Sequence, residues 1–127
     1  MTRRALIAGV LVTLGAALWL GAAGGRAESP SGVVGILTRG PTQPVCTAEE
    51  PCEAPAAGVT LSFVRAGRVS GRARTGSAGG FRLRLAPGLY AIRTSAKPFG
   101  TVPTPARARV WPSRFTRLEL SIDTGIR

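Results

Sequence analysis

Apolar and polar residues alternate with a period of two along several short stretches of the chain, the pattern of half-buried β-strands. The clearest case is the run Phe-Arg-Leu-Arg-Leu at 81–85, whose apolar side chains fall on one face and whose arginines fall on the other. Ala86-Pro87-Gly88 follows as a turn, because proline presets φ and glycine accepts the strained position. Tyr90 and Ile92 then resume the apolar face. The segment predicts a β-hairpin that pairs 81–85 with 89–94.

The same alternation, bounded by glycine and proline, predicts five further strands. Residues 66–67 and 76–80 are predicted turns, and 40–58 and 97–105 are predicted loops. Beyond the N-terminal segment, no stretch of sequence shows helical periodicity. We therefore predict an all-β fold, a seven-stranded antiparallel two-sheet sandwich. The five further strands are Gly32–Thr38, Val59–Val64, Arg68–Thr75, Ala106–Val110 and Phe115–Asp123.

The residues of the predicted hairpin also carry a resemblance to a known family. Together with Gly79, they resemble the G-x-F-x-x-x-L-x-P-G-x-Y core of carboxypeptidase regulatory-like domains, which belong with the transthyretin-like (prealbumin-like) sandwiches. The remaining chain, with its cysteine-containing loop, is similar to small secreted bacterial members of that group. The resemblance implies a prealbumin-like fold and a structural or binding role as an accessory to other proteins. The residues that carry the motif are Phe81, Leu85, Pro87, Gly88 and Tyr90.

The first 27 residues have the composition of an export signal. Arg3 and Arg4 precede an apolar run at 5–23, and small residues around Ala27 fit a signal-peptidase cleavage site. We expect a signal peptide at 1–27 and a mature domain at 28–127, secreted or periplasmic. Two alternatives stay open: an uncleaved helix that anchors the chain, since about 20 apolar residues span a bilayer, and export by a twin-arginine route.

The two cysteines of the chain, Cys46 and Cys52, lie close together in the predicted loop at 40–58. In an exported protein such an isolated pair predicts a disulfide, which here would pin the loop. A metal site is the alternative, but no histidine and no third cysteine exist to complete it. Three glutamates surround the pair in a spacing that matches no calcium-binding loop, so we expect them to be solvated. They are Glu49, Glu50 and Glu53.

The chain contains no histidine. This removes the Ser-His-Asp and Cys-His nucleophile systems and the commonest metal ligand. We therefore expect no enzyme activity, no metal and no cofactor. A serine–lysine dyad through Lys97 and a Lys97–Asp123 crosslink stay formally open. Asparagine is also absent, which excludes a lysine–asparagine isopeptide bond and N-glycosylation.

Arginine is the one residue type whose pattern suggests a ligand. The chain has 17 basic and 6 acidic residues, for a net charge of +11. If 68–75 pairs with 81–85 through the turn at 76–80, four arginines gather on one sheet, and three more share their outward parity. Guanidinium groups bind carboxylate and phosphate in a bidentate manner. The four candidate anion-binding residues are Arg72, Arg74, Arg82 and Arg84, and the other three are Arg93, Arg107 and Arg109.

A solvated face that keeps strand edges from aggregating is the alternative interpretation of these arginines. The sequence as a whole predicts a non-catalytic, exported accessory domain of the bacterial envelope, structural or binding. A binding module for anionic envelope polymers, a glycan or a lipid headgroup, is the second hypothesis. The expected partner is thus an unidentified envelope protein or an anionic polymer.

Aromatic residues bear on two further expectations. Few of them interleave with the arginines, which disfavours nucleic acid as a partner. We expect membrane association only through an uncleaved N-terminal segment. Trp111, beside Pro112, is predicted to cover the edge of the core, with an exposed sugar-stacking platform as the alternative.

Overall fold

The computed structural model describes residues 29–127, and the predicted signal peptide lies outside the described residues. Within 29–127 the chain forms eight strands and no helix, and therefore no helix that is long and apolar enough to cross a bilayer. The strands are β1 (Gly32–Gly40), β2 (Ala54–Pro55), β3 (Thr60–Arg65), β4 (Arg68–Arg74), β5 (Gly80–Arg84), β6 (Gly88–Thr94), β7 (Arg107–Val110) and β8 (Phe115–Asp123).

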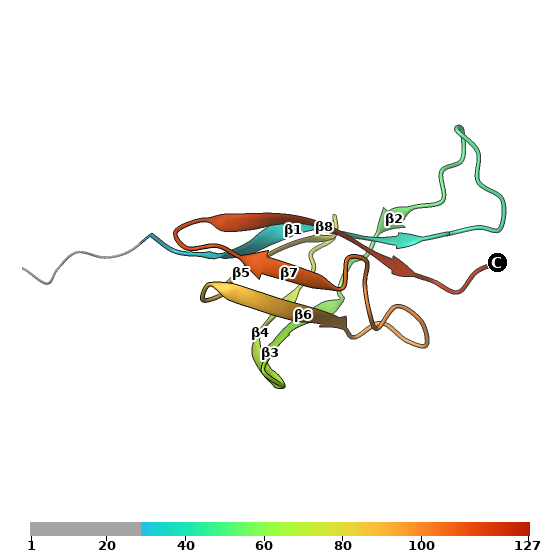
Figure 1. Ribbon diagram of the computed structural model, residues 1–127. Helices are drawn as coiled ribbons and strands as arrows, with labels where there is room; N and C mark the ends of the chain where they lie inside the picture. Colours follow the sequence, from blue (N-terminus) through green and yellow to red (C-terminus); the bar gives the residue numbers. More distant parts are fainter. Residues whose placement is uncertain (1–28) are drawn as a thin grey trace, which may run out of the picture.

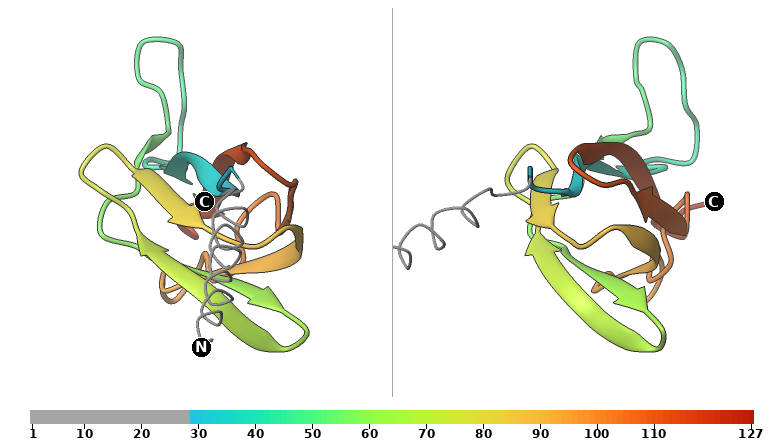
Figure 2. Two further views of the ribbon diagram at one scale, coloured as in Figure 1. Left: turned by 90° about the vertical axis from the view of Figure 1, so that its left-hand side faces the viewer. Right: turned by 60° about the vertical axis from the view of Figure 1, so that its left-hand side comes forward.

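The strands form two sheets that face each other (Figures 1 and 2). In the first, sheet A, β1 lies in the centre, with β8 on one edge and β5 and β2 on the other. The second, sheet B, has the order β4-β3-β6-β7. The predicted all-β, two-sheet sandwich is thus confirmed. The eighth strand, β2, is a short one within the predicted loop at 40–58, and one pair, β1 with β8, is parallel.

The core lies between the sheets and is built from the alternating apolar positions. Tyr90 and Phe63 are among its largest fully buried side chains. The Tyr90 hydroxyl donates to the carbonyl of Ala86 at 2.6 Å, which satisfies its polar atom at the edge of the core. The buried apolar residues are Val33, Leu37, Ala56, Leu61, Phe63, Phe81, Leu85, Tyr90, Ile92, Ala108, Val110, Leu118, Leu120 and Ile122.

The predicted hairpin of 81–85 with 89–94 is wrong, because these segments belong to different sheets. β5 pairs with β1, whereas β6 pairs with β3 and β7. The end of β5 is fixed to sheet A: the Leu85 N–H donates to the carbonyl of Ser31 at 3.1 Å, and the Ser31 hydroxyl donates to the carbonyl of Leu85 at 2.6 Å. Ala86 and Pro87 therefore connect two layers rather than two neighbouring strands.

The predicted pairing of 68–75 with 81–85 is also wrong. β4 pairs with β3, and the turn at 76–80 carries the chain from sheet B to sheet A. Gly79 sets this crossing: its φ is 82°, and its carbonyl accepts the N–H of Leu37 at 2.8 Å, which extends the β1–β5 ladder. A Cβ at Gly79 would overlap the Leu37 carbonyl oxygen, so the turn requires glycine there.

Thr75 is a buried polar residue at the point where the chain leaves β4. Its hydroxyl donates to the carbonyl of Ala56 at 2.5 Å and accepts the N–H of Val59 at 2.9 Å. Thr75→Val keeps the shape but leaves both backbone groups unpaired, so we expect urea denaturation to show a loss of about 2–3 kcal/mol in unfolding free energy. Thr75→Ser keeps the hydroxyl and should lose much less. Equal losses would show that the methyl group removed in Thr75→Ser contributes as much to stability as the two hydrogen bonds of the hydroxyl.

Candidate anion-binding surface

The structure divides the four candidate arginines between opposite sides of the molecule. Arg72 and Arg74 alternate with the inward positions of β4 and project from the outer face of sheet B. Arg82 and Arg84 alternate with the core residues of β5 and project from the outer face of sheet A. Because the sheets share one core, these outer faces look in opposite directions (Figure 2). The four side chains do not form one surface.

Sheet B collects a different set of arginines. Arg72 lies opposite Ser62, which lies opposite Arg93 on its other side. β7 adds two more arginines at outward positions: Arg107 lies opposite Ala91, and Arg109 lies opposite Leu89. All of them are exposed. We call this set the sheet B arginine face; it comprises Arg72, Arg74, Arg93, Arg107 and Arg109.

Arginines occur on both sheets, but acidic residues are absent from sheet B. The strands of sheet B contain seven arginines and no acidic residue. Within 29–127, the single ion pair joins Arg127 to Asp123 at 3.1 Å. No carboxylate of the described residues therefore neutralises the sheet B arginine face, and its charges reinforce one another. The five acidic residues of this part of the chain lie in the β1–β2 loop or in β8: Glu49, Glu50, Glu53, Glu119 and Asp123.

Arg82 on sheet A has a packing role instead. Its guanidinium carbon lies 3.9 Å from the centroid of the Phe115 ring, in a cation–π contact. Gly32 of β1 lies between the strands that carry these two residues. A Cβ at Gly32 would meet the Phe115 ring at 2.8 Å, so the missing side chain lets the ring reach Arg82.

Trp111 lies at the end of β7, at the same strand parity as Arg109, and is 46% exposed. The guanidinium carbons of Arg109 and Arg114 lie 5.3 and 5.6 Å from the centroid of its ring. Both are farther from the ring than Arg82 is from Phe115. Trp111 is therefore a rim residue that keeps an open aromatic surface beside two cations.

The predicted disulfide between Cys46 and Cys52 is present, with the Cα atoms 5.3 Å apart. It closes the tip of the β1–β2 loop, which projects beyond the sandwich (Figure 1). The Gln43 amide organises the same tip by donating to the carbonyls of Val45 and Glu50 at 2.9 and 3.0 Å. Within 29–127, no three Cys, Asp or Glu side chains gather as metal ligands.

Removal of both cysteines, Cys46→Ala with Cys52→Ala, should leave the sandwich folded. The ring is short and lies away from the core, so the expected loss of unfolding free energy is roughly 2 kcal/mol. Denaturant titration monitored by circular dichroism measures it. A double variant that does not fold would show that the loop is part of the folding unit rather than an appendage.

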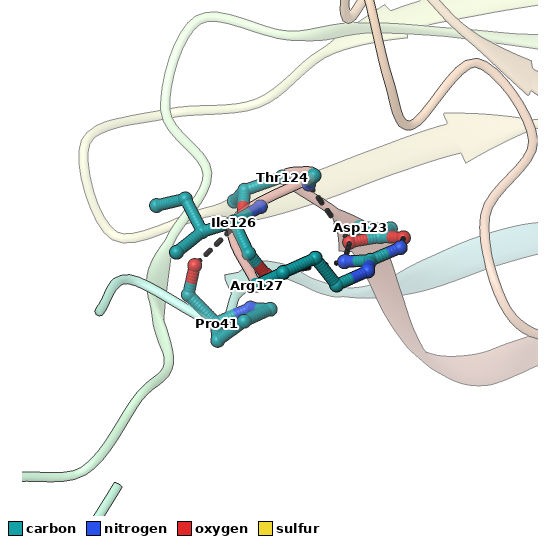
Figure 3. A network of polar contacts seen from close by, with 6 residues as sticks. Pro41, Asp123, Thr124, Ile126 and Arg127 are labelled. Atoms are coloured by element: carbon teal, nitrogen blue, oxygen red, sulfur yellow. Dashed lines mark hydrogen bonds and ion pairs between the residues drawn. The ribbon is translucent and has the colours of Figure 1, made fainter. Parts of the chain in front are cut away.

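The C-terminal residues are fastened to the base of this loop (Figure 3). The Thr124 hydroxyl donates to the carbonyl of Pro41 at 2.6 Å, and the Asp123 carboxylate accepts hydrogen bonds from Arg127 and from the Gly125 N–H. The Arg127 bond is the main reason why the pKa of Asp123 is lowered. This contact is therefore present above the ordinary carboxyl pKa and is lost as pH falls through the lowered value.

Two open clefts lie next to this network. One, of about 340 Å³, is lined by Glu53, Thr104 and Ser121 among others, and it offers an anion no cationic side chain. The other, of about 230 Å³, is lined by two cations, Arg39 and Lys97, and by Asp123, which was left open as a crosslink partner of Lys97. In this second cleft the Asp123 carboxylate lies beside the two cations, whereas the strands of sheet B carry several arginines and no carboxylate. The sheet B arginine face is therefore the stronger candidate site for anions.

The sequence did contain a signal for the absence of acidic residues from sheet B. From Ala54 to Leu118 no Asp or Glu occurs, a stretch that includes all of sheet B.

Comparison with protein-family models and with curated proteins gives no match for this chain. The fold and the charge distribution therefore carry the functional argument.

Proposed function

We propose that the protein is an exported, non-catalytic accessory domain of the bacterial envelope that binds anionic groups through the sheet B arginine face. The motif residues around Pro87-Gly88 and the two-sheet sandwich support placing it with carboxypeptidase regulatory-like, prealbumin-like domains. The lack of histidine supports a role without catalysis.

One observation carries the proposal: five exposed arginines share a face whose strands hold no carboxylate. Charges of either sign, or a mixture of both, keep a merely solvated face in solution, whereas a face of cations alone also creates a positive potential that attracts anions. Arginine is suited to carboxylates, sulfates and phosphates because its planar fork makes two parallel hydrogen bonds. A repeated anion on a polymer or surface would therefore engage several of these side chains at once.

Retention on heparin tests the proposal with matched charge reversals. The test variant is Arg72→Glu with Arg93→Glu, which lie on either side of Ser62 on sheet B. The control is Arg84→Glu with Arg117→Glu on the outer face of sheet A, which changes net charge equally. We expect affinity to fall about tenfold or more in the test variant and much less in the control, because exposed charges act over only about 8 Å at physiological salt.

The comparison has a clear negative outcome. Equal losses in the two double variants would mean that net charge alone retains the protein. A domain that does not bind heparin at low salt would remove the binding role altogether. A structural accessory role would then be the remaining function.

Export is tested separately through the N-terminus. The charged start, the apolar run and the small residues before Glu28 predict a product that begins at Glu28 outside the cytoplasm. Mass spectrometry of the protein from the culture medium and periplasm measures this. A membrane-bound product that still begins at Met1 or Thr2 would support the anchor instead.

A further inference from the structure

An apolar strip crosses the sheet B arginine face. Val69 of β4 lies opposite Val64 of β3, and Val64 lies opposite Ala91 of β6. Leu89 follows two residues from Ala91 on the same face of β6. Val69 is 43% exposed and Leu89 is 46% exposed, so the strip presents large aliphatic side chains to solvent.

Trp111 continues the strip beyond β7. Leu89 lies opposite Arg109, and Trp111 follows Arg109 at the same strand parity. The strip thus ends in a half-exposed indole with Arg109 and Arg114 beside it. Arg72 and Arg93 form a row along one flank. The result is a hydrophobic band with cationic borders, on a sheet without carboxylates.

We propose that this band docks the domain on an anionic lipid bilayer. The arginines bind the phosphates of the headgroups, while Leu89, Val69 and Trp111 enter the interfacial region. Basic residues are drawn to anionic leaflets, and tryptophan favours the boundary between headgroups and hydrocarbon. The inference rests on the proposed function and names the anionic surface as a membrane, contacted without help from the N-terminal segment.

The aliphatic side chains are what favour a lipid surface over a glycan or a nucleic acid. Single-stranded nucleic acids are held by aromatic side chains that stack on successive bases, and an acidic glycan would use the arginines but not the aliphatic strip. This face has one aromatic side chain, Trp111, and an aliphatic strip that stacks poorly on sugars or bases. Aliphatic groups gain free energy when they leave water for hydrocarbon. At an anionic bilayer, both the arginines and the aliphatic strip of this face make favourable contacts.

Trp111 provides the measurement. The domain from Glu28 to Arg127 contains every core residue of the described part of the chain, and Trp111 is its one tryptophan. Mixed with vesicles of phosphatidylglycerol and phosphatidylcholine, it should bind, and its tryptophan emission should shift to shorter wavelength. Vesicles of phosphatidylcholine alone should give neither effect. Lipids brominated on the acyl chain should quench the emission of bound protein.

Substitutions in the strip separate insertion from charge. Leu89→Thr and Val69→Thr introduce threonine, which is well accepted in strands, at two exposed positions of the strip. The control is Ile36→Thr on sheet A, since Ile36 is also an exposed aliphatic residue, at 50% exposure. Each strip variant should bind the anionic vesicles about three- to tenfold more weakly, with Leu89→Thr at the upper end of that range. Val69→Thr replaces one methyl group by a hydroxyl, and Leu89→Thr removes more aliphatic surface, so less apolar area leaves water on binding. The control should bind as the unmodified domain does, and thermal unfolding should show all three folded.

Heparin retention distinguishes failure of this inference from failure of the proposed function. If heparin and anionic vesicles both bind, but the Trp111 emission does not shift and the strip variants bind normally, the face binds anions without inserting. In that case the membrane inference is overturned and anion binding stands. If neither heparin nor vesicles bind, both are wrong. Saturable binding to an acidic glycan with no vesicle binding would assign the face to the glycan.

Discussion

Gly35→Ala is expected to destabilise the protein more than any exposed substitution. Gly35 lies in β1 between β5 and β8, buried in the centre of sheet A. A Cβ there would overlap the carbonyl oxygen of Leu118, which is backbone and cannot move without separating β8 from β1. We expect a loss of about 3 kcal/mol or more in unfolding free energy, measured by urea denaturation.

Gly76→Ala is the matched control for this prediction. Gly76 lies in the turn between the sheets, where the nearest atom to an added Cβ is the Gly80 carbonyl oxygen at 4.0 Å. The substitution should change stability by no more than about 0.5 kcal/mol. Similar losses at both positions would show that the cost comes from glycine chemistry in general and not from the close approach of β1 to β8.

Phe63→Ala should have an effect of comparable size for a different reason. Phe63 is fully buried on β3 between the two sheets. Its truncation leaves a cavity that the surrounding strands fill only in part, and such changes cost about 3–5 kcal/mol. For a domain of this size that corresponds to a fall of roughly 12–40 °C in melting temperature, which calorimetry would record.

Phe99→Ala tests whether burial is the cause. Phe99 is 51% exposed and lies on the loop between β6 and β7. The same chemical change there should cost much less than half as much, because fewer atoms lose packing contacts. If the two variants proved equally unstable, the core would not lie where the burial of Phe63 places it.

Strands could be predicted from this sequence because alternation acts within each strand. The inward positions of β3, β5, β6 and β8 follow directly from where apolar residues recur. The pairing of strands could not be predicted in the same way. Phe81 and Tyr90 face the core whether their strands lie side by side in one sheet or across from each other in two, so the pattern is identical in both arrangements.

The prediction of the candidate anion-binding residues failed for the same reason, because alternation does not determine which strands pair. Arg82 and Arg72 are both outward on their own strands, as the alternation predicts. Which outward residues share a surface depends on which sheet each strand joins, and this is decided at Gly79 and at Ala86-Pro87. Arg93, Arg107 and Arg109 carried the right parity, and the structure places them on the same outer face of sheet B as Arg72 and Arg74.

The position of β1 also affects when the fold can close. β1 is paired along one edge with β8, and β8 is made last when the chain is synthesised from its N-terminus. Until residues 115–123 emerge, one edge of β1 has no partner, and sheet A is incomplete. For a chain exported as we propose, this order delays completion of sheet A until β8 has been made, and an incompletely folded chain is what a general secretion channel accepts. A prematurely terminated chain would keep that open strand edge and be prone to aggregate.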